Sequence, residues 1–320
     1  MGGSPVNYIG IDLGGTNIKG ALVSGAGEVL CEESCPTHAE RGADAVCDAI
    51  AEVIAALSSG MDRASLGGAG LGCPGTVDDE TGRVIYANNL GWTDLDLRAA
   101  IRARTGLSLR LGNDANVAAL AEALVGCARG AESAVVVTLG TGVGGGVVLD
   151  GRMLTGYTGA ASELGHMVIR AGGEECTCGR RGCFEAYASA TALIRETKRA
   201  MAAHPESLMH AAAGENGTVD GRTAFAAAQR GDAAAQAVVD RYVEDLACGL
   251  ANIVNIFFPE VIALSGGIAN QGDALLVPLR ERVCALSYGS NHAARHTRIE
   301  RCTLGYRAGV IGAALLARQA

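Results

Sequence analysis

The fold is set by one stretch near the start of the chain, Tyr8-Ile-Gly-Ile-Asp-Leu-Gly-Gly-Thr-Asn-Ile-Lys-Gly-Ala-Leu-Val23. Two apolar runs flank a glycine turn here, Leu13 to Asn17, and this pattern predicts two strands joined by that turn. A third strand is expected over Val29 to Glu33, after a turn at Gly25 to Gly27. The stretch therefore predicts a β-meander at the head of the chain.

The same plan returns in the middle of the chain, in Ala134-Val-Val-Val-Thr-Leu-Gly-Thr-Gly-Val-Gly-Gly-Gly-Val-Val-Leu149, where a strand, a glycine turn over 140–146 and a second strand over 147–149 are expected. Helices are predicted over 43–57, 96–104, 115–124, 223–229, 233–257, 275–286 and 308–318, further strands over 66–71, 82–86, 109–111 and 261–265, and a loop over 203–221. Meanders followed by helices, twice over, predict a duplicated α/β fold with a cleft between two lobes.

Composition and charge exclude several classes of protein. The chain has 320 residues, of which 49% are hydrophobic and 19% charged, and this excludes a disordered chain. Its net charge is −8 and no Lys/Arg run occurs, which disfavours a nucleic-acid binder. Only two lysines occur, Lys19 and Lys198, and neither precedes Ser or Thr, so a Walker A loop is excluded.

The cysteines indicate a reducing compartment. There are eleven of them, scattered except for one cluster. The first residues show no basic stretch before a long apolar run, and the uncharged stretch over 133–149 is broken by glycines. We therefore expect a cytoplasmic protein with free thiols and no membrane span.

Two glycine turns are candidate phosphate sites. Asp12 with Gly14, Gly15 and Thr16 would let backbone N–H groups approach a phosphate, with the aspartate near Mg²⁺; the alternative is a hairpin turn with a solvated carboxylate. The second turn, Thr138 to Gly146, contains the spacing of a dinucleotide fingerprint. A strand rather than a helix is expected after it, so a Rossmann fold is rejected.

The segment Gly112-Asn-Asp-Ala-Asn116 lies between an expected strand and an expected helix. Asn113 or Asp114 fits an ordinary helix N-cap. The alternative is a carboxylate at the end of a strand, kept ionised by the helix N-terminus and directed at a substrate hydroxyl. Phosphoryl transfer has a loose transition state, so such a base need not be strong.

A third constellation predicts a metal site. His166, Cys176, Cys178 and Cys183 supply one imidazole and three thiols, a complete tetrahedral set for Zn²⁺. Because the protein would fill all four positions, the zinc is expected to be structural. Glu163 and Glu185 flank the cluster; they are surface carboxylates, or the ordered loop presents both to a polyol.

Together these motifs resemble the ROK family (repressors, unassigned reading frames and sugar kinases) over nearly the whole chain. The motifs that carry the resemblance are Ile9 to Thr16, Leu111 to Ala119, Thr138 to Gly146, Glu163-Leu-Gly-His166 and Cys176 to Tyr187. The resemblance implies a two-lobed actin- and hexokinase-like (ribonuclease H-like) α/β fold that closes on a sugar and ATP. We expect a small lobe over 1–113 and 305–320 and a large lobe over 114–304.

The resemblance also implies residue roles. Asp114 would be the general base. The sugar would be held by Asn88, Asn89, Asn113, Asp114, Glu163, His166 and Glu185. ATP and Mg²⁺ would be held by Asp12, Gly14, Gly15, Thr16, Thr141, Gly142, Gly266 and Gly267. Structural Zn²⁺ would be held by His166, Cys176, Cys178 and Cys183. One departure is Asn17, where many members have Lys, although Lys19 is near.

The function implied is an ATP-dependent hexose kinase, most similar to bacterial glucokinases, acting as a homodimer without nucleic acid or membrane. Glucose is the expected substrate; mannose, N-acetylmannosamine, N-acetylglucosamine, allose and fructose are alternatives, and polyphosphate is an alternative donor. Repressor members carry an N-terminal helix-turn-helix arm, and the first strand begins too early here for one to fit. A DNA-binding regulator is therefore disfavoured, and the intact Asp114 disfavours a non-catalytic sugar sensor.

Overall fold

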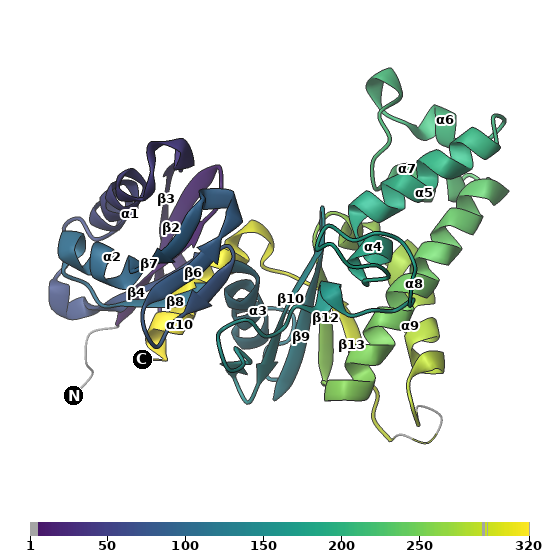
Figure 1. The fold of residues 1–320 in the computed structure, drawn as a ribbon. Helices are drawn as coiled ribbons and strands as arrows, with labels where there is room; N and C mark the ends of the chain where they lie inside the picture. Colours follow the sequence, from purple (N-terminus) through teal and green to yellow (C-terminus); the bar gives the residue numbers. More distant parts are fainter. Residues whose placement is uncertain (1–5, 290–291, 293, 320) are drawn as a thin grey trace. The chain divides into compact units, whose positions relative to one another are not determined.

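Figure 1 shows the chain as a computed structural model, described over residues 6–289, 292 and 294–319. The chain forms two compact units. Unit 1 comprises Met1–Ser133, Gly146–Ser162 and Thr303–Ala320, and unit 2 comprises Ala134–Gly145 and Glu163–Cys302. The lobe boundaries expected from the sequence stay a prediction, and each unit is described by itself.

The main sheet of unit 1 has the strand order β3-β2-β1-β4-β8. Its strands are β1 (Asn7–Leu13), β2 (Asn17–Ser24), β3 (Val29–Pro36), β4 (Leu66–Cys73) and β8 (Leu109–Asn113). The pairs β1–β2 and β2–β3 are antiparallel, which confirms the predicted meander, and β1, β4 and β8 run parallel. Parallel strands bring their carboxyl ends to one edge of the sheet.

Helices cover both faces of this sheet. Alternate residues of a strand point to opposite faces. The side chains of Ile9 and Ile11 share a core with α1 (Ala43–Leu57) and α2 (Leu97–Thr105), whereas a Cβ on Gly10 would lie 1.8 Å from a carbonyl oxygen of α10 (Ala308–Arg318). The last helix therefore packs against the first strand, and α3 (Asp114–Leu124) packs beside it.

A small antiparallel sheet completes unit 1. Its order is β5-β6-β7, with β5 (Thr76–Asp78), β6 (Arg83–Ala87) and β7 (Trp92–Leu95). The one-turn helix η3 (Asn88–Leu90) lies between β6 and β7, with Leu90 buried and both asparagines exposed. The strand β5 directly follows Gly75, so the glycine-rich strand β4 leads into a strand and not into a helix.

In unit 2, β9 (Ser133–Leu139), β12 (Val261–Ser265) and β13 (Arg298–Arg301) are parallel neighbours. The helices are α4 (Glu185–Ala188), α5 (Ala190–Ala203), α6 (Met209–Ala212), α7 (Thr223–Ala228), α8 (Ala233–Phe257) and α9 (Asp273–Leu286). Helix α8 contacts α5, α7 and α9, which makes it the central helix of this unit. Most of its buried side chains recur at helical spacing.

Two expectations are corrected. The second glycine turn ends earlier than predicted, because β10 (Val143–Leu149) already begins at Val143. Its glycines lie inside the strand because neighbours approach closely: a Cβ on Gly145 would lie 2.9 Å from the Val136 carbonyl oxygen. The expected loop over 203–221 contains α6, whose Met209 is fully buried.

No helix in the described part of the chain is both long and apolar enough to cross a bilayer.

Candidate functional site

The carboxyl edge of the unit 1 sheet gathers the first set of predicted residues. Across the parallel strands Asp12 lies opposite Gly72, and Gly72 lies opposite Gly112. Asp114 follows β8 directly. The two aspartates are near enough that the charge of Asp114 raises the pKa of Asp12. The sheet register therefore brings together carboxylates that are about a hundred residues apart in sequence.

Asp114 is held in a defined position at the N-terminus of α3. Asn113 is the N-cap, and its Oδ1 accepts hydrogen bonds from the N–H groups of Ala115 at 3.0 Å and Asn116 at 3.2 Å. The Oδ1 of Asp114 itself accepts from Ala115 N–H at 2.8 Å. The capping interpretation thus holds for Asn113, and Asp114 is the carboxylate that directly follows this cap.

Burial raises the pKa of Asp114 above its usual range, and the hydrogen bonds from Ala115, its own backbone and Asn113 oppose this shift. The helix N-terminus also favours the ionised form. The net shift is upward, so this carboxyl group holds a proton more readily than an exposed aspartate does. A general base in phosphoryl transfer has to accept a proton, and a raised pKa favours that step.

Asp12 lies beside the last helix. Burial raises its pKa, Lys19 opposite it on β2 lowers the pKa, and Asp114 raises it. A Cβ on Gly309 would lie 2.7 Å from the Asp12 carboxyl carbon, so a glycine is needed where α10 passes. Two neighbouring carboxylates, partly removed from water, form a site whose charge a divalent cation would balance.

The first glycine turn is anchored from behind by Thr37. Its hydroxyl donates to the carbonyl oxygen of Gly14 at 2.6 Å, and its N–H donates to that of Thr16 at 2.8 Å. Gly15 and Thr16 are exposed, whereas Thr37 is 1% exposed. Binding the turn through its carbonyls fixes its shape and leaves its outer side open to a ligand.

The predicted asparagines lie at the same end of unit 1. A Cβ on Gly15 would be 3.6 Å from the Asn89 Cβ, so Asn89 lies against the first glycine turn. The Oδ1 of Asn88 accepts a hydrogen bond from the Tyr86 hydroxyl at 3.1 Å. Asn113 Nδ2 donates to the carbonyl oxygen of Gly75 at 3.0 Å, which ties β8 to the segment after β4.

In unit 2 the second glycine turn is braced by two neighbouring segments. The carbonyl oxygen of Gly140 accepts from Ala190 N–H at 2.8 Å, and that of Thr141 accepts from the Thr191 hydroxyl at 2.7 Å. On its other side, Val143 N–H donates to Glu185 Oε2 at 3.0 Å. A Cβ on Gly142 would lie 2.2 Å from that oxygen, so a larger residue here would displace the Glu185 carboxylate.

Gly266 and Gly267 follow β12 on the same edge of unit 2. Gly266 has φ of +89°, and a Cβ there would lie 2.3 Å from the Leu139 carbonyl oxygen. The hydroxyls of Thr138 and Ser265, at the ends of two adjacent parallel strands, are 2.8 Å apart. The carboxyl edge of a parallel sheet is where α/β folds bind ligands, and this edge carries both predicted nucleotide segments of unit 2.

The four predicted zinc ligands are brought together in what we call the knuckle, residues 166–183. All four ligand atoms lie within 4.8 Å of one another. His166 Nδ1 is 3.7 Å from Cys176 Sγ, and Cys178 Sγ is 3.7 Å from Cys183 Sγ. Tetrahedral Zn²⁺ with Zn–S bonds of about 2.3 Å places sulfurs roughly 3.8 Å apart, so the residues fit zinc.

Two thiols of the knuckle differ in their pKa. Hydrogen bonds from the backbone and side chain of Arg180 lower the pKa of Cys178 to about 6, whereas burial raises that of Cys183 to about 11. The Arg180 guanidinium also donates to the His166 carbonyl oxygen at 2.9 Å. Arg180 thus offsets negative charge that three thiolates would place on the knuckle.

The two flanking glutamates differ. Glu163 is exposed and precedes the short helix η4 (Leu164–His166), which also carries the ligand His166. Glu185, at the start of α4, contacts both the second glycine turn and the knuckle, where Thr177 donates to its Oε1 at 3.0 Å. Sequence reasoning missed the anchoring residues Thr37, Thr177 and Thr191, because threonine in a loop carries no periodic signal.

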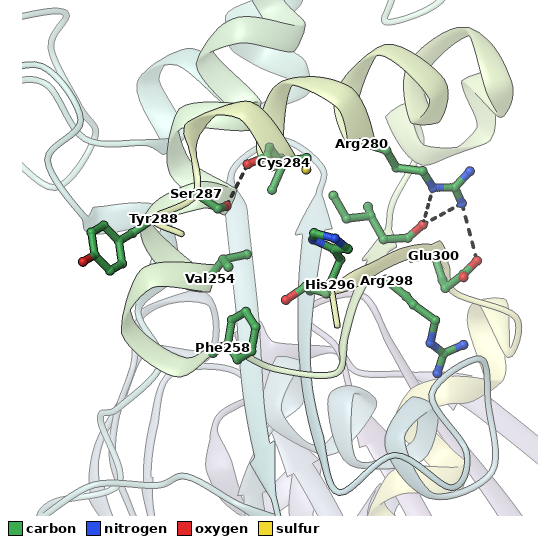
Figure 2. A pocket seen from close by; sticks show the side chains of 12 residues that line it. Val254, Phe258, Arg280, Cys284, Ser287, Tyr288, His296, Arg298 and Glu300 are labelled. Atoms are coloured by element: carbon green, nitrogen blue, oxygen red, sulfur yellow. Dashed lines mark hydrogen bonds and ion pairs between the residues drawn. The ribbon is translucent and has the colours of Figure 1, made fainter. Parts of the chain in front are cut away.

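The pocket on α8, α9 and β13, of about 270 Å³, contains none of the predicted residues. Arg280 there donates to the Ile299 carbonyl oxygen at 2.6 and 2.9 Å and lies 3.5 Å from a carboxylate oxygen of Glu300. Figure 2 shows Arg280 and Glu300 in this pocket. A larger polar cavity of about 740 Å³ in unit 1 is lined by Asn113. Volume alone therefore does not identify the site. In unit 1 the candidate site is the carboxylate pair with the first glycine turn, and in unit 2 it is the second glycine turn with the knuckle.

Comparisons with known proteins place the chain. A model of the ROK family matches residues 8–320. The glucokinase of Halalkalibacterium halodurans is 38% identical over 98% of this chain and 95% of its own. The putative xylose repressor of a Caldicellulosiruptor species is 31% identical over 95% of this chain and 76% of its own.

Among solved structures, a ROK family glucokinase from Streptomyces griseus in complex with glucose and AMPPNP matches with a TM-score of 0.78 and 33% identity, over 98% of this chain and 100% of the other. This match confirms the fold class expected from the sequence, the two-lobed actin- and hexokinase-like α/β fold. The cleft between the lobes stays a prediction.

Proposed function

The chain belongs to the ROK family, and on that premise we propose that it is an ATP-dependent hexose kinase that converts glucose to glucose 6-phosphate. The observation that carries the proposal is Asp114, a half-buried carboxylate held at the N-terminus of α3 and near Asp12. Glucokinases among the relatives, including one bound to glucose and AMPPNP, support this substrate and this nucleotide.

In the proposed reaction Asp114 accepts a hydrogen bond from the sugar 6-hydroxyl and takes its proton as the oxygen attacks the γ-phosphorus. The bond from the γ-phosphorus to the bridging oxygen breaks, and ADP leaves. Since most bond breaking precedes proton transfer in a loose transition state, positioning by Asn113 and Ala115 matters more than basicity.

The nucleotide is assigned to the two glycine turns. Gly14, Gly15 and Thr16 in unit 1 and Thr141 and Gly142 in unit 2 would contact phosphate oxygens through backbone N–H groups and hydroxyls. Gly266 and Gly267 would lie near the adenosine. Asp12 would hold Mg²⁺, which neutralises phosphate charge when bound.

The sugar is assigned to hydrogen-bonding side chains from both units: Asn88, Asn89, Asn113, Asp114, Glu163, His166 and Glu185. A site built on hydrogen bonds discriminates strongly between hexoses that differ by one hydroxyl or acetamide. Structural Zn²⁺ would be held by His166, Cys176, Cys178 and Cys183. It would order residues 163–185, which include the proposed sugar ligands Glu163, His166 and Glu185. His166 would bind zinc through one ring nitrogen and donate to the sugar through the other.

Further proposals follow from the family. We place the protein in the cytoplasm as a homodimer, with lobes over 1–113 with 305–320 and 114–304. A sugar-responsive regulator is the second candidate function, because a putative xylose repressor is among the relatives. The chain covers 76% of that relative, so the repressor has sequence that this chain does not match.

A panel of hexoses assayed with Mg·ATP tests the function. We expect the highest kcat/KM with glucose and lower values with mannose, allose, fructose and the N-acetylhexosamines. If an N-acetylhexosamine were turned over faster than glucose, that sugar would be the substrate, and the protein would still be a sugar kinase. Absence of ATP turnover with every sugar, together with DNA binding at a stated salt concentration, would favour the regulator.

A further inference from the structure

Glu185 connects two segments that the proposed function assigns to different substrates. Its Oε2 accepts at 3.0 Å from the backbone N–H of Val143, the first residue of β10, which directly follows the turn proposed to bind the phosphates. Its Oε1 accepts from the hydroxyl of Thr177, in the knuckle, at 3.0 Å. The same side chain is a proposed ligand of the sugar. Glu185 and both of its partners, Thr177 and Val143, lie in unit 2.

The carboxylate has room for all these partners. An ionised carboxylate offers about four acceptor positions. Val143 and Thr177 occupy two, and the Sγ of Cys176, 3.6 Å from Oε1, stands near a third. A cysteine that ligates zinc is a thiolate and has no proton to donate. With metal bound, Thr177 is therefore the knuckle residue that still donates to Glu185.

Rigid neighbours make this connection effective. Gly142 approaches Glu185 so closely that a Cβ would lie 2.2 Å from Oε2, so the turn and the carboxylate are in direct contact. Thr177 stands between two metal ligands, Cys176 and Cys178, and a tetrahedral metal would fix its backbone. Thr177 itself is exposed and touches neither sugar nor phosphate in the assignment above.

We propose that Thr177 is a positioning residue that couples the knuckle to the phosphate turn through Glu185, so that an ordered knuckle tightens nucleotide binding. The inference rests on the proposed function, because it takes the turn at Gly140 to Gly142 as part of the ATP site. Coupling of this kind is reciprocal: a nucleotide that orders the turn also favours the position of Glu185 that receives the sugar.

The test measures AMPPNP binding by calorimetry on the full chain, with zinc content determined in the same samples. T177V keeps the shape of the side chain and removes the hydroxyl. We expect it to bind AMPPNP roughly tenfold more weakly, the effect of one lost hydrogen bond to a charged acceptor. Its zinc content should equal that of the wild type, and T177S should restore affinity.

Two controls separate the coupling from general damage. T218V removes another exposed hydroxyl of unit 2, which donates to the Glu215 carbonyl oxygen at 2.8 Å, and should leave AMPPNP affinity unchanged. Removal of zinc with a chelator should weaken AMPPNP binding by the wild type more than by T177V. Circular dichroism checks that both stripped proteins remain folded.

A zinc-loaded T177V with wild-type AMPPNP affinity would overturn the inference, and so would loss of zinc from T177V, since Thr177 would then act through metal retention. In both cases the proposed function stands, because the wild type binds the nucleotide. A wild-type protein that binds no AMPPNP would overturn the proposed function and the coupling together.

Discussion

At the scale of single residues, Asp12 and Asp114 share one property: burial raises the pKa of each carboxyl group. The folded protein therefore holds these protons more tightly than the unfolded chain does. Their contribution to the free energy of unfolding is present in full below the unfolded pKa and is lost as pH rises through the folded pKa. Where pH is high enough to ionise them in the folded protein, both carboxylates lower the free energy of unfolding.

Asp114→Asn tests this assignment. The amide keeps an oxygen for the Ala115 N–H but cannot accept the sugar proton, so turnover should fall by about 10²–10⁴-fold while glucose still binds. Removal of the buried charge should also raise the free energy of unfolding at pH 7. This increase in the free energy of unfolding should become smaller as the pH falls below the ordinary pKa of a carboxyl group.

Urea titrations at pH 7 and in acid, with a steady-state assay, measure both effects. Near-wild-type turnover in Asp114→Asn would refute the base, and a drop in stability at pH 7 would refute the view that its charge is costly in the fold.

Sequence reasoning was most informative about residues with special chemistry. The positions of Asp114 and the four metal ligands could be predicted because few alternatives exist for an aspartate at a strand–helix junction or for three clustered thiols. The hydrogen bonds of Thr37 could not be predicted, because they depend on the fold bringing Thr37 next to the carbonyl oxygens of Gly14 and Thr16. The same is true of Thr177 and Thr191.

At the scale of elements, α10 depends on glycines that let backbones approach. A Cβ on Gly312 would lie 1.7 Å from the carbonyl oxygen of Val117 in α3, the helix that begins at Asp114. Gly312→Ala should therefore destabilise unit 1 by about 1–3 kcal/mol through overpacking and lower turnover by displacing α3.

Equilibrium unfolding in urea measures this loss. Gly214→Ala is the matched control, because this exposed glycine has φ of −68° and its nearest neighbour would be 3.6 Å from a Cβ. Equal stability of both variants would show that α10 can shift without cost.

The knuckle makes a second prediction at this scale. Cys178→Ser should reduce bound zinc from about one ion per chain to a small fraction, and should weaken glucose binding more than AMPPNP binding, because three sugar ligands lie on or next to the knuckle. Cys284→Ser is the control, since that thiol is exposed on α9. Metal analysis measures the bound zinc, and calorimetry measures the binding of glucose and AMPPNP. A wild-type protein that contains no zinc after purification without a chelator would contradict the proposed zinc site.

Elements with strong periodicity were predictable to within a residue or two: α1, α8 and α10 begin and end as expected. The start of β10 was not, because glycines that indicate a turn in sequence can also lie in a strand where neighbours approach closely. The strand β13 was missed: its sequence, Arg298-Ile-Glu-Arg301, has charged residues around one buried isoleucine.

At the scale of the whole molecule, two units each present a glycine turn at the carboxyl edge of a sheet. Unit 1 adds the carboxylate pair, and unit 2 adds the knuckle and Glu185. The duplicated strand–turn–strand plan was visible in the sequence, whereas the pairing of β1 with α10 required the fold, since these segments lie at opposite ends of the chain.

The most direct test is the rate of glucose 6-phosphate formation from glucose and Mg·ATP, compared between the wild type and Asp114→Asn. We predict steady turnover by the wild type and about 10²–10⁴-fold less by the variant, with glucose affinity retained. A wild type that forms no glucose 6-phosphate, or a variant that forms it at the same rate, would contradict the account.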